Sequence, residues 1–141
     1  MRNLAILGST GSIGTATLGV VAAHPERLRV VALAAGRNRD LLKAQCETFR
    51  PHCVSVSSQA DADWLRSELS YRPELHWGPE GLLACALHPD ADTVVAAIVG
   101  SAGLASTEAA LRGGRRVCLA NKESLVAVSY THLTLPTKRI V

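Results

Sequence analysis

A glycine-rich turn near the amino terminus is the part of the sequence best suited to bind phosphate. Gly8, Gly11 and Gly14 stand three residues apart, between a short apolar run at 3–7 and a segment of helical periodicity at 12–23. A diphosphate needs backbone amides that no Cβ obstructs and the positive end of a helix dipole. We expect Gly8 to allow a tight turn, Gly11 to allow close approach of the ligand, and Gly14 to allow close helix–strand contact. The pattern predicts a dinucleotide-binding turn, and a purely structural turn is the alternative.

The residues that follow the second apolar run indicate which dinucleotide would bind. An NAD site usually places Asp or Glu there, to accept a hydrogen bond from the ribose 2′-hydroxyl. This sequence has Gly36, Arg37, Asn38 and Arg39 instead. Planar guanidinium groups suit the oxygens of a 2′-phosphate, so the sequence favours NADPH. The alternative is a pair of solvated arginines at the start of a helix.

A third polar group follows the last predicted strand and consists of Asn121, Lys122 and Glu123. At the carboxyl end of a parallel strand, the lysine could meet an anionic substrate while its two neighbours contact a cofactor. A helix N-terminus capped by Asn121 explains the same spacing equally well.

These groups are predicted to sit on alternating strands and helices. We expect strands at 3–7, 28–35, 53–56, 75–77, 92–99 and 116–120, and helices at 12–23, 40–50, 59–69, 80–87 and 104–112. Strands and helices that alternate at this spacing form βαβ units. The predicted fold is therefore an α/β fold, a Rossmann-like doubly wound parallel sheet.

Composition and charge narrow the functional classes. With 141 residues, 48% hydrophobic and 19% charged, the chain has the size of one domain and can bury a core. The sequence contains no apolar run near the ~20 residues that cross a bilayer, and the stretch after Met1 is too short for a signal peptide. We therefore expect a cytoplasmic protein. Both ends are basic and the middle is acidic, which suits a small anionic ligand better than a nucleic acid.

The remaining residues with metal or redox chemistry show no motif. The cysteines lack Cys-x-x-Cys spacing and are predicted to be reduced thiols packed as small hydrophobic side chains: Cys46, Cys53, Cys85 and Cys118. Four histidines lack ligand spacing and are predicted to be surface or turn residues: His24, His52, His76 and His88.

Segments 4–14, 30–38, 96–100 and 119–126 resemble the N-terminal NADPH-binding domain of the 1-deoxy-D-xylulose 5-phosphate reductoisomerase family. The run Ala-Asn-Lys-Glu-Ser-Leu is the most specific part of this resemblance. It implies NADPH-dependent conversion of 1-deoxy-D-xylulose 5-phosphate, a sugar phosphate, to 2-C-methyl-D-erythritol 4-phosphate in non-mevalonate isoprenoid biosynthesis. It also implies a divalent metal, Mg²⁺ or Mn²⁺, and a homodimer.

Matched position by position, the resemblance implies a set of ligand contacts. The diphosphate of NADPH would contact Thr10, Gly11, Ser12 and Ile13, and its 2′-phosphate end would contact Gly36, Arg37 and Asn38. Asn121 and Glu123 would also contact NADPH, and Lys122 would contact the substrate.

The sequence departs from the family after about residue 127. Residues 128–141 have no acidic side chain and no clear periodicity, and they look like the translation of a sequencing adapter. We therefore expect an NADPH-binding domain at 1–127, truncated before the catalytic domain, and an unstructured non-native tail at 128–141. The family's acidic metal ligands lie beyond this region, so we assign no catalytic residue and no metal ligand. The chain alone is expected to bind the cofactor without catalysis.

Three other functions share the glycine pattern. A short-chain reductase needs Tyr-x-x-x-Lys, but Leu75 follows Tyr71 at that spacing and Thr134 follows Tyr130. A semialdehyde dehydrogenase needs a nucleophilic cysteine, and Cys118, inside a predicted strand, is a poor candidate. A non-catalytic nucleotide-binding module remains as the alternative from another class.

Overall fold

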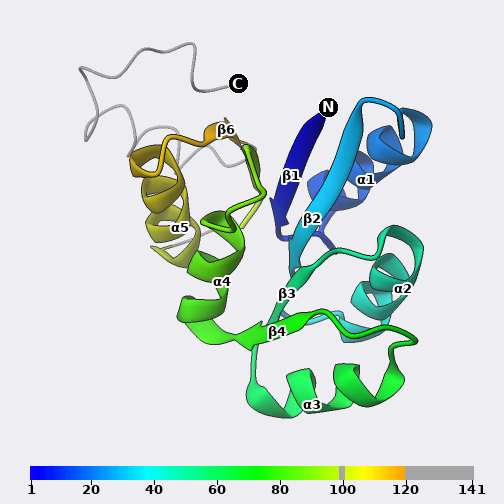
Figure 1. Cartoon of the computed structure of the whole chain (residues 1–141). Coiled ribbons are helices and arrows are strands. Elements are labelled where there is room, and N and C mark those ends of the chain that lie inside the picture. Colours follow the sequence, from blue (N-terminus) through cyan, green and yellow to red (C-terminus); the bar gives the residue numbers. More distant parts are fainter. Residues whose placement is uncertain (99–100, 120–141) are drawn as a thin grey trace.

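Strands and helices alternate along the whole described part of the chain, which comprises residues 1–98 and 101–119 of a computed structural model (Figure 1). The elements are β1 (Arg2–Leu7), α1 (Ser12–Ala23), β2 (Leu28–Ala34), α2 (Arg39–Phe49), β3 (Cys53–Val56), α3 (Gln59–Glu68), β4 (Glu74–Trp77), α4 (Gly78–Ala86), β5 (Thr93–Ala96), α5 (Ser101–Arg112) and β6 (Arg116–Leu119). The predicted α/β fold class is confirmed.

The strands form one parallel sheet in the order β4-β3-β2-β1-β5-β6. The chain moves outward from β1 to β4 and then returns to place β5 on the other side of β1. The direction of winding therefore reverses between β1 and β5. In open α/β sheets this reversal leaves a crevice at the carboxyl ends of the strands, where ligands bind.

Helices cover both faces of the sheet, as a doubly wound fold requires. Successive strand residues point to opposite faces, so in β1 the side chains of Leu4 and Ile6 join one core cluster and those of Ala5 and Leu7 join the other. The first cluster also contains residues of α1, α2 and α3, and the second contains residues of α4 and α5. Nearly continuous apolar strands are the consequence of burial on both faces.

Two predicted boundaries were wrong by several residues. β5 ends at Ala96 rather than at 99, and α5 begins at Ser101 rather than at 104. The partner strand explains the first difference, because Ala96 pairs with Leu7, and beyond Leu7 the chain turns away at Gly8 with φ +89°. On the side of β1 the ladder therefore ends at Ala96, whatever the apolar sequence beyond it.

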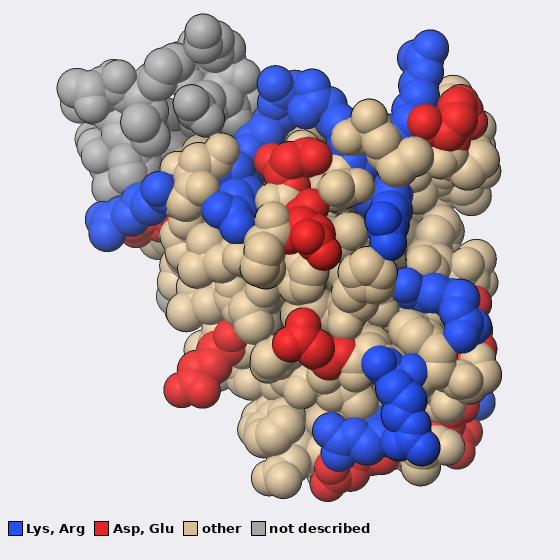
Figure 2. All heavy atoms as spheres, viewed as in Figure 1, with Lys and Arg blue, Asp and Glu red and all other residues tan. Residues whose placement is uncertain are grey.

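The described surface carries charges of both signs. Lys and Arg side chains are interspersed with Asp and Glu over the face drawn in Figure 2, without one continuous basic area on that face. Among the described helices, none is both long and apolar enough to cross a bilayer.

Candidate nucleotide-binding site

The glycine turn lies where the winding of the sheet reverses. The backbone N–H groups of Gly8 and Ser9 both donate to the carbonyl oxygen of Ala34, at 2.7 and 3.0 Å, which ties the turn to the end of β2. A Cβ on Gly8 would lie 2.8 Å from the carbonyl oxygen of Ala97, just after β5. With φ at +89° and this contact, only glycine fits at position 8 without strain. The turn after β1 and the segment after β5 therefore lie against each other.

The other two glycines differ in what surrounds them. A Cβ on Gly14 would lie 2.2 Å from the carbonyl oxygen of Gly8, so the first turn of α1 packs directly on the loop that precedes it. A Cβ on Gly11 would lie no closer than 3.6 Å to another group, and this residue is exposed. The sequence predicted close helix–strand contact at Gly14, and the structure shows close contact with the turn after β1 instead. Gly11 leaves open space next to the helix N-terminus.

The N-terminus of α1 is free to meet an anion. Gly11 is its N-cap and offers no side-chain acceptor, and the first turn contains no acidic residue. The first backbone N–H groups of a helix have no partner within the helix, and the helix dipole adds positive charge at this end. Thr10 lies in the turn, while Ser12 and Ile13 are exposed at the start of α1. This arrangement suits a phosphate group.

A buried glutamine supports the turn from α2, a role that sequence reasoning missed. The side-chain amide of Gln45 donates to the carbonyl oxygen of Ser9 over 2.9 Å, and both residues are buried. Leu42 and Cys46 flank Gln45 on the same buried side of α2. A polar side chain at a core position of an amphipathic helix was the signal that could have identified it.

The two arginines that follow β2 differ in their contacts. Arg39 donates to Asp61 over 3.1 Å, and its guanidinium lies 4.4 Å from the ring centre of Trp64. The Asn38 side chain accepts from the backbone N–H of Leu41 over 3.1 Å and so caps α2. Arg37 is exposed and makes no side-chain hydrogen bond or ion pair with the described residues. Of the two guanidiniums, Arg37 is the one available to a ligand.

A cavity of about 320 Å³ extends from the glycine turn along the carboxyl ends of the strands. Such a volume is near the lower end of the range for small-molecule sites. Its lining combines the end of β5, the ends of β2 and β3 and the start of α4: Gly8, Ala35, Gly36, Ser55, Val56, Ser57, Gly78, Pro79, Leu82 and Ile98. The cavity therefore brings Gly8 together with Gly36, as a cofactor that reaches from one to the other would require. Asn121, Lys122 and Glu123 lie outside the described residues.

The described residues do not fit a magnesium site. Within 1–98 and 101–119, the one group of His, Cys, Asp and Glu side chains that could hold a metal ion is Cys53, Glu74 and His76. Mg²⁺ requires an octahedron of oxygen ligands, and this group offers one carboxylate beside a sulfur and a nitrogen. No reaction step through a hard divalent cation can be derived from these residues.

The cysteines are free, and three of them are buried, as predicted. Burial raises the pKa of Cys46 to about 12 and also raises the pKa of Cys118. Burial likewise raises the pKa of Tyr71, whose hydroxyl donates to the carbonyl oxygen of Pro51 over 2.9 Å. These groups are protonated at neutral pH and serve the core rather than the turn.

Comparisons with known proteins agree with this geometry. The family model described as 1-deoxy-D-xylulose 5-phosphate reductoisomerase matches residues 4–129. A relative of that name from Geobacter metallireducens is 58% identical over 127 residues, which cover 89% of this chain and 33% of the relative.

Two solved structures have folds similar to that of this chain. One, of DOX-P reductoisomerase in complex with magnesium, has a TM-score of 0.90 at 39% identity and covers 100% of this chain and 36% of that chain. Another, in complex with NADPH, fosmidomycin and magnesium, has a TM-score of 0.83 at 43% identity. The match covers 89% of this chain and 31% of that chain. The chain spans about a third of the length of the proteins it matches. With the family model matching most of its residues, the chain belongs to the 1-deoxy-D-xylulose 5-phosphate reductoisomerase family.

Proposed function

We propose that this chain binds NADPH and supplies the cofactor-binding part of a 1-deoxy-D-xylulose 5-phosphate reductoisomerase. The observation that carries the proposal is the glycine turn at the reversal of the sheet, next to an α1 N-terminus that has neither a side-chain cap nor an acidic residue. Gly8 and Gly14 leave no room for a Cβ, whereas Gly11 leaves its side open toward solvent. A similar chain has been solved with NADPH, which supports the choice of cofactor.

The proposed contacts follow the order of the crevice. The diphosphate lies over Gly8, Thr10, Gly11, Ser12 and Ile13, where the first N–H groups of α1 donate to its oxygens. The 2′-phosphate lies near Gly36 and Asn38, with Arg37 as its charged partner. The Asn38 side-chain oxygen accepts the capping hydrogen bond of α2, and the NH₂ group of the same side chain is the donor for the phosphate. Asn121 and Glu123 contact NADPH and Lys122 contacts the substrate, as the family resemblance implies.

The reaction proposed for the whole protein is the conversion of 1-deoxy-D-xylulose 5-phosphate to 2-C-methyl-D-erythritol 4-phosphate. Bound NADPH supplies the hydride for the reductive step. The residues described here bind and orient that cofactor. They provide no oxygen-rich site for Mg²⁺, so we propose that the 141-residue chain binds NADPH without turnover. The family resemblance implies that the whole protein acts as a homodimer.

Thermal unfolding of the chain with NADPH and with NADH tests the proposal, since a ligand that binds only the folded state raises the melting temperature. We expect the larger shift with NADPH. In Arg37→Ala the preference for NADPH should fall by roughly 10- to 100-fold in Kd, the value of a charge-assisted hydrogen bond. Arg39→Ala is the matched control and should keep the preference, because that guanidinium is held by Asp61 and Trp64.

Other outcomes would identify the error. Equal shifts with both cofactors would contradict the assignment of Arg37 while leaving the glycine turn in place. Loss of the preference in Arg39→Ala alone would show that Arg39, and not Arg37, contacts the 2′-phosphate. A cooperatively unfolding chain that shifts with neither cofactor would contradict the nucleotide site.

A further inference from the structure

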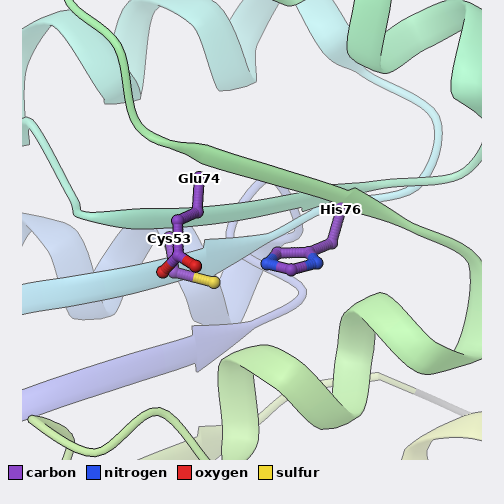
Figure 3. A group of neighbouring side chains, drawn as sticks. All are labelled: Cys53, Glu74 and His76. Carbon is purple, nitrogen blue, oxygen red and sulfur yellow. The ribbon is translucent and has the colours of Figure 1, made fainter.

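A second cluster of reactive side chains begins at the amino ends of β3 and β4 and extends along β4 to His76. Cys53 and Glu74 are the first residues of these strands and pair directly across the parallel ladder. His76 follows Glu74 by two residues, so all three side chains project from the same face of the sheet. Figure 3 shows the carboxylate and the imidazole both turned toward the sulfur of Cys53.

The three potential ligand atoms are close enough to share one ion. The Cys53 sulfur, a Glu74 carboxylate oxygen and a His76 ring nitrogen all lie within 4.8 Å of one another. A tetrahedral zinc ion with bonds of ordinary length holds its ligand atoms about 3.3–3.8 Å apart. Side-chain movements of about 1 Å would close the difference, and the exposed Glu74 and half-buried His76 have room for them.

The cluster faces a cavity that provides both access and a free coordination position. This cavity has a volume of about 310 Å³ and lies between β4, α4 and the segment that follows α4. It is lined by all three residues, together with Glu80 and His88. A cation held by Cys53, Glu74 and His76 would therefore keep a fourth position for water or another ligand, as zinc sites with three protein ligands do.

His88 lies next to one of the potential ligands. The backbone N–H of Asp90 donates to Nδ1 of His88 over 3.2 Å, so neutral His88 carries its proton on Nε2, which lies 3.8 Å from Glu74. His88 therefore lies beside the Glu74 carboxylate, beyond direct hydrogen-bond distance, with its Nδ1 already engaged.

Cys85 and α4 support the other two groups. The sulfur atoms of Cys85 and Cys53 lie 3.7 Å apart, so Cys85 contacts the sulfur of Cys53 inside the core. A Cβ on Gly81 of α4 would lie 3.2 Å from the Cβ of His76, so the helix packs closely behind the imidazole.

We propose that Cys53, Glu74 and His76 form a binding site for a zinc-class divalent cation. Sulfur and imidazole ligands suit Zn²⁺ and Co²⁺, whereas Mg²⁺ and Ca²⁺ require oxygen ligands. The site differs in chemistry from the magnesium named with the similar solved structure. Its Cys53 and Glu74 lie at the opposite ends of their strands from the nucleotide crevice. Binding of the ion displaces the proton of the Cys53 thiol to solvent.

Titration of the reduced, metal-free 141-residue chain with Co²⁺ tests the proposal by absorption. One equivalent of Co²⁺ should give thiolate-to-cobalt charge transfer in the near ultraviolet and the visible bands of a tetrahedral site. Zn²⁺ should displace the Co²⁺, and a large excess of Mg²⁺ should not. Cys53→Ser should abolish the charge-transfer band, and His76→Gln and Glu74→Gln should each weaken Co²⁺ binding by at least about tenfold.

Matched variants exclude other sulfur and nitrogen donors. Cys118→Ser and His24→Gln remove the same side-chain types elsewhere and should leave the spectrum and stoichiometry unchanged. Circular dichroism checks that each variant folds. If the variant at the buried Cys53 does not fold, the Glu74→Gln and His76→Gln variants, at partly exposed positions, still test the proposal. A charge-transfer band that survives in folded Cys53→Ser, binding unchanged in both His76→Gln and Glu74→Gln, or no saturable Co²⁺ binding would overturn the proposal. A Cys53–Cys85 disulfide that persists under the reducing conditions, detected by mass spectrometry, would do so too.

Discussion

The side-chain amide of Gln45 donates a hydrogen bond of 2.9 Å to the carbonyl oxygen of Ser9, and this bond joins α2 to the glycine turn. Both groups are buried, so water cannot replace the bond if either is removed. The turn is therefore held on three sides, by Ala34 at the end of β2, by the segment after β5 and by Gln45.

Removal of this amide should destabilise the fold. Gln45→Leu retains much of the side-chain volume and leaves the Ser9 carbonyl without its donor, so we expect a loss of about 1–3 kcal/mol in the free energy of unfolding. Denaturant unfolding measures it. Thr48→Ala, on an exposed position of the same helix, is the control and should change stability far less. Equal effects of the two substitutions would show that the buried bond has no special weight.

Two glycines of α1 should respond to alanine in opposite directions. In Gly14→Ala the new Cβ would lie 2.2 Å from the backbone oxygen of Gly8, and we expect destabilisation of about 1–3 kcal/mol. Gly19 has nothing within 4 Å, and Gly19→Ala should stabilise the chain by about 0.5–1 kcal/mol through helix propensity. Paired denaturant curves decide the point. A stable Gly14→Ala variant would mean that α1 can move away from the turn at little cost.

Arg39 and Arg37 should differ in their effect on stability. Arg39 pairs with Asp61 and stacks on Trp64, so Arg39→Ala should lower the free energy of unfolding by about 0.5–1 kcal/mol. Arg37→Ala should have almost no effect without ligand, because that side chain has no such contacts among the described residues. A larger loss of stability in Arg37→Ala than in Arg39→Ala would contradict the availability of Arg37 to a ligand.

The contact between α2 and the loop after α3 should make stability depend on acid. Glu47 accepts hydrogen bonds from the backbone N–H and the hydroxyl of Ser70, at 2.7 and 2.5 Å, and these bonds lower its pKa in the folded chain. A carboxyl group with a lowered folded-state pKa stabilises the fold above its unfolded-state pKa of about 4.3, and the contribution disappears as the pH falls through the folded-state value.

Glu47→Gln should therefore be less stable than the original chain at pH 7, and the difference should shrink as the pH falls below about 4.3. Melting temperatures measured from pH 7 down to pH 3 provide the comparison. Glu26→Gln, at an exposed turn residue, is the control for removal of a surface carboxylate. A difference that stays constant across this range would contradict the role of the Glu47 carboxylate.

The sequence alone determined the sheet type and the place of the glycine turn. Both features are local in the sequence. Strands buried on both faces appear as continuous apolar runs, such as those near residues 2–7 and 28–34. The turn appears as glycines at a fixed spacing. The position of the turn between a strand and a helix was therefore predictable, together with the need for glycine at positions 8 and 14. The place after the second strand also identified Arg37 and Arg39 as candidate partners of a 2′-phosphate, but it did not choose between them.

Only the tertiary structure decided which residues meet across the chain. The end of β5 depended on its pairing with β1. Arg39 contacts Asp61, which lies 22 residues further along the chain, and Gln45 contacts Ser9, which lies 36 residues earlier. The cluster of Cys53, Glu74 and His76 had no ligand spacing in the sequence, because strand register, not local spacing, places Glu74 opposite Cys53. Contacts that depend on which strands become neighbours, and in which register, are set by the packing of the whole sheet and leave no local pattern.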